Sequence, residues 1–179
     1  MLSRVASSIY WLNRYIERVE NYARFIEVNL NLSLDLPRGT VEQWEPLVAT
    51  TGDHEAFSNR YGKATKEAVI RFLSADAANP NSILSCLVAA RENARSVREI
   101  ISTDMWEQVN RFHLMVRDAV SKGLSSHNLH AFLSDVKAAS HLFLGIADAT
   151  MSRGEGWHFA RLGRLLERAD KTSRILDVK

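Results

Sequence analysis

The sequence is poor in cysteine. Cys86 is the only one among 179 residues, so the chain cannot form an internal disulfide, and zinc sites built from cysteine pairs are excluded. Cys86 lies in the apolar run 83–88, where the simplest interpretation is a small buried side chain in a protein of a reducing compartment. We therefore expect a cytoplasmic protein.

Long apolar runs and an excess of charge of one sign are also missing. No stretch approaches the roughly 18 apolar residues that span a bilayer, and the first residues begin a charged amphipathic pattern unlike a signal peptide. Lysine and arginine number 23 against 21 aspartates and glutamates, whereas a nucleic-acid binder normally has a dense basic stripe. We expect neither a membrane nor a nucleic-acid partner.

Proline and glycine are scarce, with three and eight residues. Between them run long segments with the 3.6-residue apolar period of helices, and no segment has the alternation of a strand. The sequence predicts an all-α fold, a helical bundle of about five long helices with an irregular insert near residues 35–62. The expected helices cover approximately residues 3–34, 63–74, 82–101, 104–120, 126–151 and 157 onwards.

The first helix has an arginine on its apolar side. Apolar residues cover more than half of its circumference, and Arg18 falls among them, between Tyr15 and Tyr22. An unpaired buried charge costs several kcal/mol, so we expect Arg18 to meet a carboxylate or helix-end carbonyls from another helix. Its planar guanidinium would also stack on Tyr15, Tyr22 or Trp11.

The two ends of the chain repeat each other. At an offset of 150 residues the identical pairs include Leu12/Leu162, Arg14/Arg164, Glu17/Glu167, Arg18/Arg168 and Arg24/Arg174. Amphipathic helices resemble one another by construction, but both ends place an arginine on the apolar flank, where the pattern alone would place a leucine. The N- and C-terminal helices therefore share a repeated Glu-Arg motif.

These motifs define a candidate site for a ligand or a partner. Besides the motifs, the site includes their neighbours one turn away and a charged segment in mid-chain, where Glu92 is a candidate partner of Arg18 or Arg168. The candidate residues are Arg14, Glu17, Arg18, Asn21, Glu92, Arg95, Arg164, Glu167 and Arg168. One interpretation is a polar network that fixes the register of the helices. The other is a pocket in which the arginines hold a carboxylate or phosphate and a glutamate acts as acid or base.

Signatures of conventional catalysis are missing. The sequence has no Gly-rich phosphate loop, nucleophile elbow or HExxH motif. His127 and His130 have an H-x-x-H spacing, and Glu155 and His158 form one E-x-x-H motif, but neither pair has the further ligands that a metal site needs. We expect no catalytic residue, no metal and no cofactor.

Three blocks of the sequence resemble a known family. They are residues 1–6 with 10–21, residues 90–99 with 105–107, and residues 159–178. On these residues the chain is similar to the bacterial alpha-E family, an all-helical family named for its Glu-Arg motif. The resemblance implies one alpha-E-like domain over residues 1–179. Similar members continue well past Val178, which implies a short member, a fragment or one half of a divided protein.

The resemblance also implies a setting for the protein. Alpha-E proteins are encoded beside ATP-grasp-like proteins that resemble amide ligases, often with a transglutaminase-like protease. The implied function is that of a non-catalytic accessory protein for an ATP-grasp-like amide or peptide ligase in peptide synthesis or processing. The alternative is an enzyme subunit or anion-binding protein that uses the paired Glu-Arg motifs. The long first helix and the uncapped last one favour a homodimer over a monomer.

Overall fold

The structure consists of helices and their connections. The computed structural model describes residues 1–35, 37 and 43–177, and every regular element in these ranges is a helix. This confirms the all-α fold class. Five helices are long: α1 (Ser3–Leu34), α5 (Ile83–Ser96), α6 (Thr103–Lys122), α7 (Leu129–Thr150) and α8 (Glu155–Asp177). Three are short: α2 (Glu45–Thr51), α3 (His54–Tyr61) and α4 (Lys66–Ser74).

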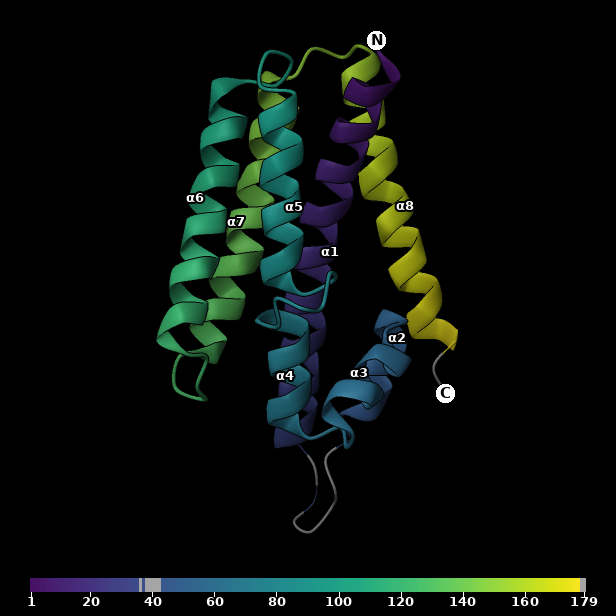
Figure 1. Cartoon of the computed structure of the whole chain (residues 1–179), viewed down its shortest axis with the longest axis vertical. Coiled ribbons are helices and arrows are strands. Elements are labelled where there is room, and N and C mark those ends of the chain that lie inside the picture. Colours follow the sequence, from purple (N-terminus) through teal and green to yellow (C-terminus); the bar gives the residue numbers. More distant parts are fainter. Residues whose placement is uncertain (36, 38–42, 178–179) are drawn as a thin grey trace.

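Four of the long helices form a ring, and the fifth lies outside it. Helix α1 packs against α5 and α7, and α6 closes the ring by packing against both. Helix α8 packs on the outside of this bundle, against α1 and α2. Figure 1 shows that α1 and α8 run in the same direction, away from the end of the molecule that holds the N-terminus. In the described part of the chain, no helix has the length and apolar character to cross a membrane.

Helix α1 is the centre of the core. Its bounds match the expected helix over residues 3–34, and its wide apolar arc is explained by neighbours on three sides, α5, α7 and α8. The fully buried residues of this arc are Ile9, Leu12, Ile16, Val19, Tyr22, Ala23 and Ile26.

The insert is more regular than the sequence predicts. Eight helices are described, five of them long as expected and three of them short, and two of the short ones, α2 and α3, lie in the segment that was expected to be irregular. Pro46 stands in the first turn of α2, where its missing N–H costs nothing, and Gly52 ends that helix with a left-handed φ of 80°. Phe57 anchors α3 in the core. Residues 36 and 38–42 of the insert, and residues 178–179, lie outside the described ranges.

Candidate functional site

The two Glu-Arg motifs lie across the interface of α1 and α8 and bind each other. Arg18 donates from Nε to Oε1 of Glu167 at 2.7 Å and from Nη2 to Oε2 at 2.9 Å. Arg168 holds Glu17 in the same way, with Nε 2.7 Å from Oε1 and Nη2 3.2 Å from Oε2. Two parallel hydrogen bonds between a guanidinium and a carboxylate form a strong and geometrically specific pair. We call these two reciprocal pairs the Glu-Arg clasp.

The clasp follows from the direction and closeness of the two helices. Because α1 and α8 run parallel (Figure 1), equivalent positions of the repeat come level with each other, and each glutamate binds the arginine of the other motif. Gly163 permits the close approach. A Cβ at this position would stand 3.1 Å from the carbonyl carbon of Tyr10 and closer still to its oxygen.

Glu167 is the more tightly held of the two glutamates. Its side chain is fully buried, Arg14 Nε donates to its Oε2 at 2.7 Å, and Lys171 Nζ lies 3.8 Å from its Oε1. Burial alone would raise the pKa of Glu167. The hydrogen bonds and charges of Arg18, Arg14 and Lys171 outweigh that effect and hold the pKa below its ordinary value of 4.5. The carboxylate therefore stays ionised.

The Glu17 half of the clasp is closer to water. The side chain of Glu17 is 1% exposed, but that of its partner Arg168 is 51% exposed. The hydrogen bond from Arg168 to Glu17 raises the pKa of the guanidinium, against a smaller opposing effect of burial. The expectation that both arginines lie on an apolar flank therefore holds for Arg18, whose side chain is 11% exposed, and not for Arg168.

Arg18 also connects the clasp to the turns that precede α3 and α5. Its Nη1 donates to Oδ1 of Asn81 at 2.7 Å, and Asn81 Nδ2 donates to Oδ1 of Asp53 at 2.9 Å. The hydroxyl of Tyr22 donates to the other oxygen of Asp53 at 3.4 Å. Asn81 and Asp53 could not be singled out from the sequence, because these residue types are common in turns for local reasons.

Aromatic rings of α1 flank the arginines. The guanidinium of Arg18 lies 5.6 Å from the ring centre of Tyr15, which is one of the expected partners. Trp11 is associated instead with Arg14, whose guanidinium carbon lies 5.3 Å from the indole. Arg14 Nη1 also donates to the hydroxyl of Tyr10 at 3.0 Å.

The mid-chain candidates do not reach the clasp. Glu92 and Arg95 pair with each other on the surface of α5, with Nη2 and Oε2 2.7 Å apart. The expectation that Glu92 pairs with Arg18 or Arg168 is therefore wrong, since both arginines take their acidic partner from the other copy of the repeat.

Two further candidates lie near the clasp without joining it. Asn21 Nδ2 and Arg164 Nε are buried, and neither has a hydrogen-bond partner among the residues that the structure describes. The structure thus brings Arg14, Glu17, Arg18, Glu167 and Arg168 together and leaves Asn21, Glu92, Arg95 and Arg164 outside.

In the clasp, both oxygens of Glu17 and both oxygens of Glu167 accept hydrogen bonds from arginines. A cavity of about 470 Å³ opens between α4 and the turn that joins α6 and α7, where Ile70, Val120 and Leu129 contribute to its wall. It includes no residue of either motif.

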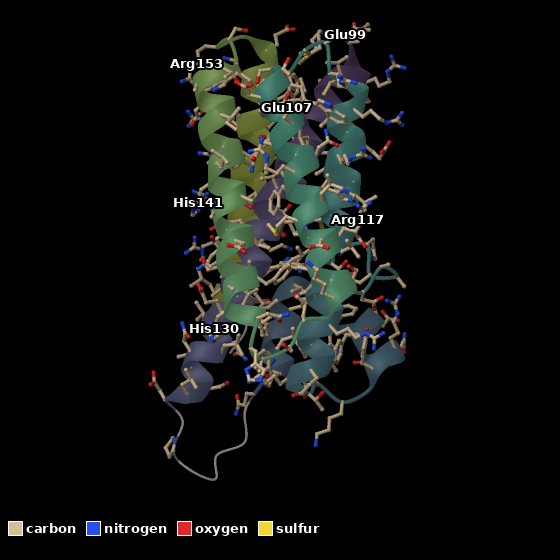
Figure 2. All side chains as sticks on the ribbon, turned by 90° about the vertical axis from the view of Figure 1, so that its left-hand side faces the viewer. Glu99, Glu107, Arg117, His130, His141 and Arg153 are labelled. Atoms are coloured by element: carbon tan, nitrogen blue, oxygen red, sulfur yellow. The ribbon has the colours of Figure 1, made fainter. Side chains whose placement is uncertain are left out.

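Figure 2 shows His130 and His141 well apart along α7. Within the described ranges, no three side chains of the metal-binding types come together.

The whole chain, residues 1–179, matches the model of the Alpha-E family, which is described as a predicted alpha-helical domain with a conserved ER motif. Similar proteins include uncharacterised proteins of Mycobacterium bovis and Mycobacterium tuberculosis, each 25% identical over 186 residues. The alignments cover 92% of this chain and 21% of each relative, so the chain spans about a fifth of their length. No solved structure matches the chain.

Proposed function

The chain belongs to the Alpha-E family, and from this premise we propose that it is a non-catalytic helical binding domain that works with an ATP-grasp-like amide or peptide ligase. Helix α8 provides the binding surface in this proposal, and the Glu-Arg clasp holds α8 in place. The ligase is the partner that the family resemblance implies.

A second apolar stripe on α8 is the observation on which the proposal rests. One side of the helix packs on α1, while the exposed stripe on the other side is apolar except for Ser173: Phe159, Leu162, Leu166, Ala169, Ser173 and Leu176. Their spacing alternates between three and four residues, as in helices that pack along a partner helix. Leu162 and Leu166 are 47% and 45% exposed. We call this set the outer stripe of α8, and its spacing suits an amphipathic helix of the partner.

The bonding of the clasp supports a binding role over a catalytic one. A general acid or base has to exchange a proton with its substrate. Glu167 is fully buried beneath Arg14 and Arg18, and both oxygens of Glu17 accept from Arg168. The four charged groups therefore satisfy each other, and their evident effect is to fix α8 on α1.

The length of the relatives also supports a binding domain. In the mycobacterial proteins, the segment similar to this chain is about a fifth of the polypeptide. A domain of this kind therefore occurs joined to much longer chain segments. Another part of such a chain can cover an exposed helix surface like that of α8.

A binding experiment with the outer stripe tests the proposal. The tagged chain is mixed with a purified ATP-grasp-like protein, the partner that the family resemblance implies, and the dissociation constant is measured by calorimetry. We expect Leu162→Glu with Leu166→Glu to weaken binding by about tenfold or more, because two leucines that the partner would cover become charges.

The matched control is Leu114→Glu with Leu142→Glu. These leucines of α6 and α7 are 46% and 49% exposed and lie away from α8, so we expect binding to be unchanged. Circular dichroism is used to check that both double variants fold. Absence of binding by the wild-type chain, or equal binding by the outer-stripe variant, would contradict the proposal.

A further inference from the structure

Arg164 occupies the position of the repeat that is equivalent to Arg14, so we expect it to have a hydrogen-bond acceptor. The Glu-Arg clasp does not provide one. Arg14, its counterpart in α1, donates from Nε to Glu167 at 2.7 Å. By the same geometry Arg164 would donate to Glu17, but Glu17 accepts from Arg168 and Arg164 Nε does not reach it. The Nε atom of Arg164 is buried and has no hydrogen-bond partner in the described part of the chain. A guanidinium in this position calls for an acceptor.

A second buried donor borders the same space. Trp157 Nε1 is also without a hydrogen-bond partner among the described residues. Both side chains line a cavity of about 20 Å³ between α7 and α8, with Asn13 of α1 also in its wall. The indole N–H and the guanidinium can only donate hydrogen bonds. The cavity has room for about one oxygen atom, so the group that satisfies both donors presents a single acceptor there.

The surroundings of the cavity are positively charged. The guanidinium carbons of Arg153 and Arg161 lie 4.4 Å and 4.8 Å from the ring centre of Trp157. Asp148 also lines the cavity, but it lies 3.6 Å from Arg153 and neutralises only one of these charges. Figure 2 places Arg153 at the end of α7, where the chain turns toward α8. Excess positive charge favours an anionic acceptor over a neutral one.

We propose that this cavity binds one oxygen of an oxyanion, a carboxylate or phosphate group, which accepts from Arg164 Nε and Trp157 Nε1. Arg161 and Arg153 hold the remaining charge at the mouth of the cavity. The site shares no residue with the Glu-Arg clasp or with the outer stripe of α8, so it does not depend on the proposed ligase partner.

The indole N–H of Trp157 is a direct probe of the site. Its signal in a nitrogen-15 NMR spectrum is assigned by Trp157→Phe, and the wild-type chain is titrated with sodium phosphate, sodium acetate or sodium chloride at equal ionic strength. We expect a saturable shift of this signal with phosphate or acetate and none with chloride. Saturation with phosphate alone assigns a phosphate group, and saturation with acetate assigns a carboxylate.

Variants of Arg164 test whether the donor itself is responsible. We expect Arg164→Gln to weaken binding by about tenfold or more, because a charge-assisted hydrogen bond is lost. Arg164→Lys keeps the charge without the Nε donor and should weaken binding as well, so the test survives if one variant fails to fold. Arg117→Gln, on the exposed side of α6 (Figure 2), should bind as the wild type does. No saturable shift, an equal shift with chloride, or unchanged binding by a folded Arg164 variant would overturn the proposal.

Discussion

Glu17 and Glu167 occupy equivalent positions of the repeat but have different surroundings. Glu167 is bound by Arg18 and Arg14, with Lys171 nearby, and all of these side chains are at least four-fifths buried. Glu17 has one basic partner, whose side chain is half exposed. A buried charge that loses its partners is costly, whereas a half-exposed arginine can turn toward water. The two halves of the clasp should therefore differ in their effect on stability.

Neutralising each glutamate in turn measures this difference. We expect Glu167→Gln to lower the free energy of unfolding by about 3 kcal/mol, because the buried guanidinium of Arg18 loses its counter-charge. Glu17→Gln should cost about 1 kcal/mol. Urea denaturation followed by circular dichroism gives both values, and equal losses would show that the burial of the partners has no influence.

The pKa of Glu167 makes the stability of the fold depend on pH. Because the folded-state pKa lies below the ordinary 4.5, the unfolded chain binds the proton more readily. The contribution is complete above the unfolded-state pKa and is lost as the pH falls toward the folded-state value. In urea titrations from about pH 6 to about pH 3, wild type should lose more stability than Glu167→Gln. Parallel losses in the two proteins would contradict this prediction.

At the scale of elements, the packing of α8 on α1 depends on Gly163. The backbone of Tyr10 occupies the space that a side chain at this position would need. Gly145, in the C-terminal half of α7, has nothing within 4 Å of an added Cβ. The two glycines therefore offer the same substitution in opposite surroundings.

Substituting alanine for each glycine in turn separates the contribution of helix propensity to stability from that of packing. Gly163→Ala should destabilise the protein by about 1–3 kcal/mol, because α8 has to move away from α1 or distort. Gly145→Ala should stabilise it by about 1 kcal/mol, since alanine is the better helix former and meets no obstacle. Melting temperatures compared by calorimetry test both signs, and a stabilising Gly163→Ala would exclude close packing at Tyr10.

The partner of Arg18 marks the limit of what helix patterns can predict. Periodicity places Arg18 on the buried flank and predicts a carboxylate from another helix, which the structure confirms. It does not say which helix lies alongside or in which direction it runs, and the partner expected for Arg18, Glu92, was therefore wrong. The internal repeat held the missing information, because equivalent positions come level when the two helices are parallel.

At the scale of the whole molecule, the sequence predicts the helices better than their arrangement. The long helices follow from sustained apolar periods, and α1 from its unusually wide apolar arc. The short helices α2 and α3 contain too few turns to establish a period, so local propensity alone could not identify them. That α8 lies outside the four-helix ring is a property of tertiary packing, which no single helix pattern encodes.

Cys86 reports on the integrity of this packing. The thiol is fully buried, and burial raises its pKa to about 12, so very little reactive thiolate forms near neutral pH. We expect no reaction with Ellman's reagent in the native protein and full reaction in unfolding concentrations of urea. Rapid labelling of the native protein would mean that the core around α1 and α5 opens readily.

The reciprocal pairing of the two motifs holds α8 on α1, and a double-mutant cycle tests this pairing. The free energy of unfolding is measured for Arg18→Met, Glu167→Gln and the double variant, and then for Arg18→Met with Glu17→Gln as the matched cycle. We predict a coupling of about 2 kcal/mol between Arg18 and Glu167 and a much smaller one between Arg18 and its sequence neighbour Glu17. Equal couplings in the two cycles, or none between Arg18 and Glu167, would contradict the Glu-Arg clasp.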